Sequence, residues 1–217
     1  MPEFNTNGNN NLTVFYDSWM EGGGTWFGQE YVEIISQRYP GRVFGKCFEW
    51  CSGPGFIGFS LLDHGLCQRL CLSDIYSPAI DAVRETARTN HCQDRVSAYV
   101  AGSIALIPET EKFDLVVANP PHYLVCPGDD NYQRIAVDKN WDSHRDFFQN
   151  IAKHMTPDGI ILLQENQVGS LRGVDEFWTM IHCNHLKVTA YFTSPNYWDV
   201  HGPTQIYYIE IRPVQDK

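Results

Sequence analysis

The sequence predicts an α/β fold in which a doubly wound, mostly parallel sheet of seven strands ends in an antiparallel hairpin at its C-terminal edge. Strand-like segments alternate with helical segments of about a dozen residues, the pattern that produces parallel sheets. The run FDLVVA at 113–118 is apolar apart from Asp114, which is typical of a strand covered on both faces. The last two strand-like segments have no obvious helix between them, and this favours a terminal hairpin.

The predicted elements follow one another along a chain of 217 residues, which we expect to form one domain over 1–217 with a flexible or partly ordered segment at 1–24. Pro78 suits the first residue of a helix. Asp158-Gly159 is expected to turn the chain before the fifth strand. Strands are expected at 43–50, 69–73, 96–100, 113–118, 160–164, 187–193 and 205–211, and helices at 29–38, 56–66, 78–90, 143–154 and 174–183.

The charge balance bears on the kind of partner. The formal net charge is -10, from 26 acidic against 16 basic residues. Proteins that bind nucleic acid usually gain affinity from Lys and Arg side chains that neutralise phosphates, and the sequence has no basic run. We therefore expect a small molecule or a protein as the partner and regard nucleic acid as the less favoured one.

Apolar runs and cysteines indicate the compartment and the metal content. No stretch approaches the roughly 18 apolar residues of a transmembrane helix, and residues 1–11 lack the apolar core of a signal peptide. The seven cysteines suggest no disulfide framework, so we expect a cytoplasmic protein. The pairs Cys47/Cys51 and Cys67/Cys71 are interpreted as small buried residues rather than metal ligands, because no His cluster completes a tetrahedral set.

A glycine-rich loop follows the first predicted core strand and precedes a helix. Gly53 and Gly55 allow a tight turn and the close approach of a ligand, and Gly58 allows the helix to pack closely on the strand. This is the arrangement of Rossmann-like nucleotide-binding folds. Asp74 ends the next predicted strand, where its carboxylate can accept both hydroxyl hydrogens of a ribose.

The acid before these glycines helps to distinguish two cofactors. A dinucleotide presents a pyrophosphate to the helix N-terminus and gains nothing from a nearby carboxylate. S-adenosylmethionine carries an ammonium and a sulfonium instead, and Glu49 could act through these charges, directly or by way of a water molecule. The loop therefore favours S-adenosylmethionine over NAD.

The segment Asn119-Pro120-Pro121-His122 ends the fourth predicted core strand. The carboxyl edge of a parallel sheet is where such folds place their chemistry. The two prolines fix the backbone, so that the side-chain oxygen of Asn119 and the carbonyl of Pro120 can both point at one NH2 group. The aromatic rings that follow, His122 or Tyr123, can stack on a flat acceptor.

These motifs resemble those of class I methyltransferases with an Asn-Pro-Pro-Tyr motif. This group includes protein-glutamine, adenine amino and small-domain guanine methyltransferases, and the resemblance covers residues 43–170. It implies S-adenosylmethionine as cofactor and S-adenosylhomocysteine as product. It also implies a set of cofactor contacts, namely Glu49, Gly53, Gly55, Gly58, Asp74, Ile75, Ser103 and Asn119.

The sequence departs from that group at three points. His122 occupies the aromatic position, where it could stack or act as a base. Gly102-Ser103 stands where relatives place an acid that binds the adenine amine, and Ser103 is a weak substitute. The chain has no room for the helical substrate domain of the release-factor methyltransferases.

Several further residues are candidates for the acceptor site. Trp26 and Phe27 precede the first core strand, where related enzymes close over the cofactor or the acceptor. Glu165 or Asn166, at the end of the fifth strand, could line the acceptor pocket. The loop before the last strand, with Tyr197, Trp198 and His201, could form a lid or a partner contact. His144 and His154 are interpreted as surface residues.

Three functions compete at this point. The first is N-methylation of a planar amide or amine nitrogen in a small molecule or a protein side chain. The second is methylation of a base amino group in RNA or DNA, which needs an extruded base or a single strand. The third is a non-catalytic adenosine-binding module. The acidic charge favours the first over the second, and Asn119-Pro120-Pro121 favours either enzyme over the third.

Overall fold

The computed structural model describes residues 2–123, 130–167, 175–194 and 206–214. The strands are β1 (Glu3–Asn5), β2 (Thr13–Phe15), β3 (Phe44–Trp50), β4 (Cys67–Asp74), β5 (Val96–Val100), β6 (Phe113–Ala118), β7 (Met155–Asn166), β8 (Leu186–Thr193) and β9 (Ile206–Pro213). The helices are α1 (Gly24–Arg38), α2 (Phe56–Asp63), α3 (Ser77–Thr89), α4 (Asp130–Ala136), α5 (Asp142–Ile151) and α7 (Asp175–His182).

Seven of these strands form one mixed sheet in the order β5-β4-β3-β6-β7-β9-β8. The pairs β3–β4 and β4–β5 are parallel, whereas β9 pairs antiparallel with both β7 and β8. The predicted α/β class, the seven strands and the antiparallel C-terminal hairpin are therefore confirmed. Among the described residues, no helix is both long and apolar enough to cross a bilayer.

The chain divides into two compact units. The first unit comprises Met1–Gly102 and Val117–Asn119, and the second comprises Ser103–Val116 and Pro120–Lys217. The boundaries fall between Gly102 and Ser103, within β6, and between Asn119 and Pro120. The glycine loop, Asp74 and Asn119 thus belong to the first unit, and the residues from Pro120 onward belong to the second.

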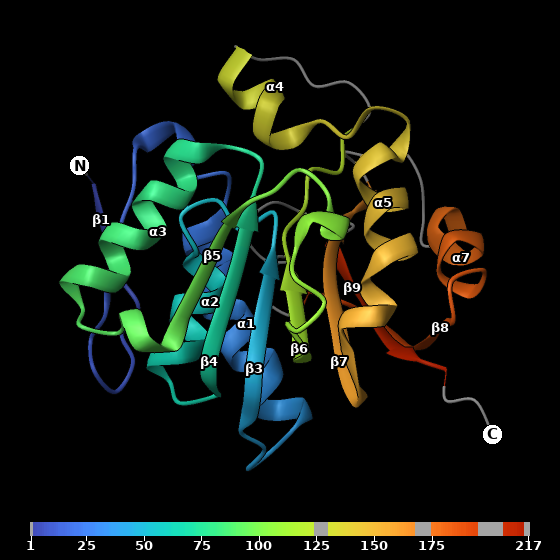
Figure 1. The fold of residues 1–217 in the computed structure, drawn as a ribbon, viewed down its shortest axis with the longest axis horizontal. Coiled ribbons are helices and arrows are strands. Elements are labelled where there is room, and N and C mark those ends of the chain that lie inside the picture. The colour runs from blue at the N-terminus through green and yellow to red at the C-terminus, as the bar shows by residue number, and fades with distance from the viewer. Residues whose placement is uncertain (1, 124–129, 168–174, 195–205, 215–217) are drawn as a thin grey trace. The chain divides into compact units, whose positions relative to one another are not determined.

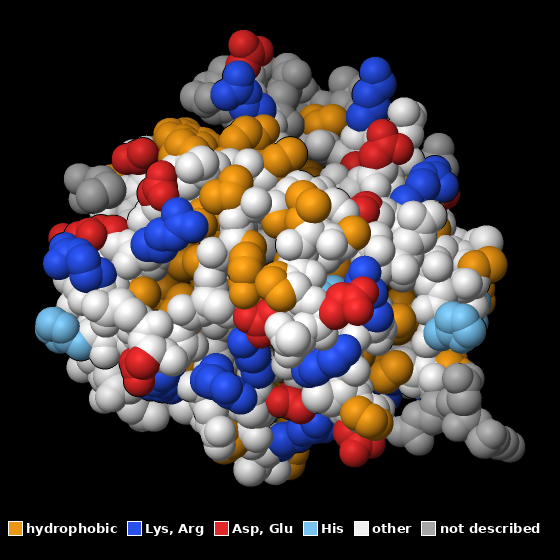
Figure 2. All heavy atoms as spheres, in the orientation of Figure 1, with side chains coloured by type: hydrophobic (Ala, Val, Ile, Leu, Met, Phe, Trp, Pro, Cys, Tyr) orange, Lys and Arg blue, Asp and Glu red, His pale blue; other side chains and the backbone are white. Residues whose placement is uncertain are grey.

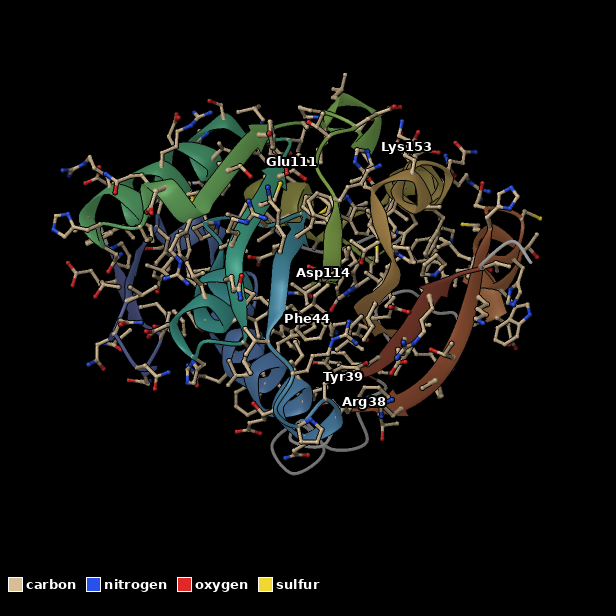
Figure 3. The ribbon with its side chains drawn as sticks, turned by 60° about the horizontal axis from the view of Figure 1, so that its bottom comes forward. Arg38, Tyr39, Phe44, Glu111, Asp114 and Lys153 are labelled. Atoms are coloured by element: carbon tan, nitrogen blue, oxygen red, sulfur yellow. The ribbon has the colours of Figure 1, made fainter. Side chains whose placement is uncertain are left out.

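In the first unit, helices α1 and α2 approach each other closely and lie behind the strands in the view of Figure 1. Small residues make this possible, because a Cβ atom on Gly28 would lie 2.9 Å from the carbonyl oxygen of Phe56. Just beyond α1, the ring of Tyr39 packs edge-on against Phe44 at the start of β3, with centroids 5.9 Å apart (Figure 3). These contacts fix the first core strand against its preceding helix.

The N-terminal segment forms an antiparallel hairpin, β1–β2, that the sequence pattern did not indicate. The buried carboxylate of Asp63, at the end of α2, holds it in place. This carboxylate accepts hydrogen bonds from the backbone N–H groups of Gly8, Asn10 and Leu12, at 2.9, 2.7 and 3.1 Å, and from the hydroxyl of Thr6. These donors lower the pKa of Asp63, although burial opposes them.

In the second unit, aromatic residues of α5 and α7 pack around a histidine. His144 and His154 are both fully buried, so their interpretation as surface residues is wrong. His144 lies on the same helical face as Phe147 and Phe148, at the i+3 and i+4 spacing of a buried stripe. The Nδ1 atom of His154 lies 3.0 Å from the carbonyl oxygen of Glu111.

Two element boundaries differ from the prediction for local reasons. Helix α1 begins at Gly24 rather than at 29, because the Glu21 carboxylate accepts hydrogen bonds from the N–H of Gly23 and the hydroxyl of Thr25, at 3.0 and 2.6 Å. Strand β7 begins at Met155 and includes Asp158-Gly159, which was expected to turn the chain before the strand. Helix α4 was not predicted.

Candidate functional site

The glycine loop adopts backbone conformations that favour glycine. Gly53 and Gly55 have φ angles of +51° and +91°, in the left-handed region. A Cβ atom on Gly55 would lie 2.6 Å from Leu72, so this glycine is also required by packing. A Cβ atom on Gly53 would meet nothing closer than a carbonyl oxygen of Met20 at 3.9 Å. Gly53 therefore faces open space, as a residue beside a ligand should.

Glu49, in β3, is buried against the start of helix α2. Its carboxyl group accepts hydrogen bonds from the backbone N–H groups of Ile57 and Gly58, at 3.3 and 2.7 Å. Burial raises the pKa of Glu49 to about 8, although these two donors oppose the shift. The side chain thus fixes the loop to the helix. A Cβ atom on Gly58 would lie 2.7 Å from this carboxyl group, which explains the glycine.

Asp74, the last residue of β4, holds the other side of the loop. Its two carboxylate oxygens accept hydrogen bonds from the backbone N–H groups of Gly53 and Tyr76, at 2.8 and 2.9 Å. Burial raises the pKa of Asp74. The side chain of the next residue, Ile75, is 63% exposed despite being apolar. The structure thus brings Glu49, Gly53 and Asp74 together as one loop assembly with an exposed apolar side chain beside it.

Asn119 is fixed by a residue that the sequence reasoning did not single out. Its side-chain amide donates a hydrogen bond to the carbonyl oxygen of Gly22, at 3.2 Å. Just before it, the carbonyl oxygen of Ala118 accepts a hydrogen bond of 2.6 Å from the hydroxyl of Tyr31. Tyr31 is fully buried in α1. Because the Asn119 NH2 group donates to Gly22, its carbonyl oxygen is the atom left for an acceptor amine.

His122 and Tyr123 lie in the second unit and differ in their surroundings. His122 is buried, and its Nδ1 atom has no hydrogen-bond partner in the described part of the chain. Burial, together with the nearby charge of His144, lowers the pKa of His122 to about 3. The backbone of Tyr123 accepts a hydrogen bond from the N–H of Asp138 and donates one to Ala136, at 3.0 and 2.9 Å. A neutral His122 suits stacking rather than proton transfer near pH 7.

Ser103, expected near the adenine amine, is engaged within its own unit. Its hydroxyl donates a hydrogen bond of 2.6 Å to Asp146 of α5 and accepts one from the N–H of Ala105. Asp146 also accepts a hydrogen bond from the N–H of Ile104, at 2.8 Å. Asp146 is separated from Ser103 by 43 residues, so no local sequence signal marked this carboxylate.

The remaining acceptor-site candidates fall into three groups. Trp26 is 40% exposed in the first turn of α1, whereas Phe27 is buried in the core. Glu165 is buried near the end of β7, and Asn166 is the last residue of that strand. Tyr197, Trp198 and His201 lie outside the described residues.

Cys47, Cys67 and Cys71 are buried in β3 and β4 as small core residues.

A mixed seven-stranded sheet with a glycine loop after its first parallel strand defines the class I methyltransferases, which use S-adenosylmethionine. Comparison with known proteins agrees, because the family model of the methyltransferase small domain matches residues 32–169. The chain therefore belongs to the methyltransferase small domain family. It is an S-adenosylmethionine-dependent methyltransferase, as the sequence motifs predicted.

Curated relatives match a shorter part of the chain. The ribosomal RNA small subunit methyltransferase C of Enterobacter sp. (strain 638) is 33% identical over 91 residues, 42% of this chain and 25% of that protein. The protein of the same name from Haemophilus influenzae (strain PittGG) is 26% identical over 92 residues, 42% of this chain and 27% of that protein. The match thus spans about a quarter of each relative.

A solved structure supports the fold alone. An S-adenosylmethionine-dependent methyltransferase from Clostridium acetobutylicum superposes with a TM-score of 0.63 at 9% identity. The superposition covers 87% of this chain and 91% of that one. An identity this low carries no information about the acceptor, but it confirms the Rossmann-like arrangement.

The expectation about partners needs correction. From the net charge, nucleic acid was the less favoured partner, and this expectation is wrong, because the curated relatives are ribosomal RNA methyltransferases. Net charge averages over the whole molecule, whereas salt screens each exposed charge beyond about 8–10 Å. Figure 2 shows Lys and Arg side chains interspersed with Asp and Glu on the face in view. The mean charge was therefore a poor guide to the local surface.

Proposed function

We propose that this chain transfers a methyl group from S-adenosylmethionine to an exocyclic amine of a base in ribosomal RNA. The observation that carries the choice of acceptor is the similarity to two ribosomal RNA small subunit methyltransferases C. The placement of Asn119 at the end of β6, with its carbonyl oxygen left for a donor, supports an amine as the acceptor group.

The first unit supplies the groups that would hold the cofactor. The open side of Gly53 gives the ligand room to approach the backbone, and the carboxylate of Asp74 has lone pairs for ribose hydroxyls beyond those used by the loop. The exposed side chain of Ile75 offers an apolar surface for the adenine. Glu49 keeps the loop and helix α2 in register.

The cofactor supplies an activated methyl group on a sulfonium, and the chain must align an acceptor nitrogen with it. An aryl amine is a poor nucleophile because its lone pair is delocalised into the ring. The Asn119 oxygen and the Pro120 carbonyl would each accept one amine hydrogen. Both acceptors stabilise the positive charge that develops as the nitrogen becomes tetrahedral. His122, neutral near pH 7, would stack on the base.

A base that is paired and stacked inside an RNA duplex cannot reach such a site, so the substrate must present an unpaired or extruded nucleotide. Stacking on aromatic side chains contributes about 1–3 kcal/mol per base and does not depend on the net charge of the protein. Trp26, which is 40% exposed and stands four residues after Gly22, offers a ring in the same unit as Asn119. The acidic composition is therefore compatible with RNA as the acceptor.

The proposal is tested by incubating the protein with labelled S-adenosylmethionine and small-subunit ribosomal RNA, either free or in the intact subunit. Digestion and mass spectrometry should reveal one N-methylated base, and Asn119→Ala should remove it. For each tenfold rise in salt concentration, the logarithm of the RNA affinity should fall by about 0.7 per phosphate contact for a single strand. Label that appears in ribosomal protein but in no nucleotide would refute the proposal.

A further inference from the structure

The second unit contains a buried cluster of three ionisable side chains outside the Asn-Pro-Pro segment. Both ring nitrogens of His144 contact carboxylate oxygens, Nδ1 at 2.6 Å from Asp138 and Nε2 at 2.9 Å from Glu165. All three side chains are at most 2% exposed. The two carboxylates raise the pKa of His144 to about 9, against the effect of burial. Burial raises the pKa of Glu165 as well, although His144 opposes that shift. The two short contacts fit an imidazolium that donates from both ring nitrogens, because a neutral imidazole carries only one N–H.

The backbone around this cluster is held in an uncommon shape. Asn140 and Trp141 both have φ angles of +59°, which non-glycine residues rarely adopt. This turn brings Asp138 to the start of α5, where it accepts hydrogen bonds from the N–H groups of Ser143 and His144, at 3.0 and 3.1 Å. Such strain persists only where the surroundings enforce it, and it is frequent at functional sites.

Several buried polar atoms near this cluster have no hydrogen-bond partner among the residues that the structure describes. Glu165 uses Oε1 for His144, whereas its Oε2 atom is buried and makes no hydrogen bond. The Tyr207 hydroxyl, opposite Glu165 in the β7–β9 pairing, is also without a partner. An unsatisfied buried polar group costs about 1–3 kcal/mol, so a grouping of them calls for an explanation. A ligand that supplies the missing hydrogen bonds is such an explanation.

The cluster is linked to the methyl-acceptor segment within the same unit. Asp138 donates its backbone N–H to the carbonyl of Tyr123, which follows Asn-Pro-Pro-His directly. The charge of His144 contributes to the lowered pKa of His122. His122 also keeps an unpartnered Nδ1 atom. A chain of hydrogen bonds from Glu165 through His144 and Asp138 to Tyr123 thus connects this carboxylate to the segment that follows Asn-Pro-Pro.

We propose that Glu165 is a specificity-determining residue whose free carboxylate oxygen accepts a ring N–H that neighbours the methylated amine. This inference rests on the proposed function. Guanine presents such an N–H beside its exocyclic amine, whereas adenine and cytosine present a lone pair at that position. A carboxylate only accepts hydrogen bonds, so it favours the guanine edge, which donates, and repels the lone pairs of the adenine and cytosine edges. His144, clamped by Asp138, is a positioning residue that orients Glu165.

The test compares two versions of a short RNA that spans the nucleotide identified in the methylation experiment above. One version carries guanine there and the other carries 2-aminopurine, which keeps the amine but replaces the ring N–H with a lone pair. We expect wild-type kcat/KM to be about tenfold or more higher for guanine, the effect of one hydrogen bond to a charged group. Glu165→Gln, whose amide can also donate, should bring the two rates within about twofold of each other.

Two variants serve as controls. Glu210→Gln changes another buried glutamate of the second unit, on β9, which contacts Thr189 and Arg212 instead of this cluster. It should leave the guanine preference intact. Asp138→Asn should reduce the preference without abolishing it, because His144 loses part of its support. S-adenosylhomocysteine binding and thermal melting establish that each variant is folded.

The outcomes separate the two proposals. Absence of methylation on any RNA base refutes the proposed function and this inference with it. Methylation of adenine or cytosine, or a wild-type preference for 2-aminopurine, overturns only the role of Glu165. An unchanged guanine preference in a folded Glu165→Gln also overturns it. If that variant does not fold, the ratio of kcat/KM for guanine to that for 2-aminopurine, measured in the wild type and in Asp138→Asn, still decides the question.

Discussion

The hydroxyl of Tyr31 donates a hydrogen bond of 2.6 Å to the carbonyl oxygen of Ala118, the residue directly before Asn119. Helix α1 thereby fixes the peptide group just before Asn119, whose side-chain oxygen is proposed to accept a hydrogen bond from the substrate amine. The contact joins residues 87 positions apart, and both are fully buried. It gives the helix before the first core strand a part in the geometry of the site.

Tyr31→Phe removes this donor and leaves a buried carbonyl without it. We expect turnover to fall about tenfold, the effect of roughly 1.4 kcal/mol on the barrier, while affinity for S-adenosylhomocysteine changes less than about twofold. Steady-state kinetics and calorimetry make the comparison. Equal losses in cofactor affinity and turnover would show that Tyr31 supports the fold in general rather than Asn119.

Asn119→Ala separates binding from chemistry more sharply. The variant loses the oxygen proposed to accept an amine hydrogen, so turnover should fall by about 10²-fold or more, the scale for one transition-state hydrogen-bonding group. The cofactor should bind almost normally, because Glu49, Gly53 and Asp74 are untouched. Calorimetry with S-adenosylhomocysteine beside single-turnover rates tests this, and preserved turnover would contradict the assigned role.

Gly53→Ala and Gly55→Ala form a matched pair in the glycine loop. Both place alanine in the left-handed region, at a cost of about 1–2 kcal/mol, but only Gly55→Ala also creates a contact of 2.6 Å with Leu72. Gly55→Ala should therefore lower the melting temperature further. Gly53→Ala should lower the melting temperature less. It should instead weaken S-adenosylhomocysteine binding by more than its loss of stability would explain. The reverse order of the two melting temperatures would contradict the packing argument.

His122 gives a prediction about pH. Its pKa falls from 6.5 in the unfolded chain to about 3 in the folded protein, so protonation favours unfolding. The stabilisation is complete above pH 6.5 and is lost as the pH falls toward 3, by about 1.4 kcal/mol per unit of pKa difference at most. The free energies of unfolding of the wild type and of His122→Phe, measured with denaturant, should therefore converge or cross as the pH falls through this range.

The same variant distinguishes stacking from proton transfer. A residue that stays neutral near pH 7 contributes no ionisation to the rate in that range. His122→Phe should therefore keep most of its activity and show the same pH–rate profile as the wild type between pH 6 and 9. A wild-type ionisation near neutrality that disappears in the variant, together with a large loss of rate, would identify His122 as a base.

The core strands and the glycine loop were predictable because local patterns encode them. The apolar run at 113–118 and the glycines before helix α2 signal their structure within ten residues. His144 also carried a local signal, since Phe147 and Phe148 place it on a buried helical face, but a lone histidine was interpreted as exposed. The contact of Ser103 with Asp146 spans 43 residues, and no periodicity reports such a distance.

The acceptor was predicted poorly for a different reason. Which molecule enters a site depends on a few directed groups, and the overall charge does not determine them. Glu165 was a candidate by its position at the end of a strand, yet it is joined through His144 to Asp138, which lies in a turn with no distinctive composition. Long-range hydrogen bonds of this kind become visible only in the folded chain.

The attachment of the N-terminal hairpin to Asp63 has a consequence for how the protein is made. The donors on Gly8, Asn10 and Leu12 have no target until the ribosome has added residue 63 and helix α2 has formed. Contacts between residues more than 50 positions apart form late, because a long loop must close first. The hairpin residues thus lack these hydrogen bonds until helix α2 has formed, and until then they are open to proteases.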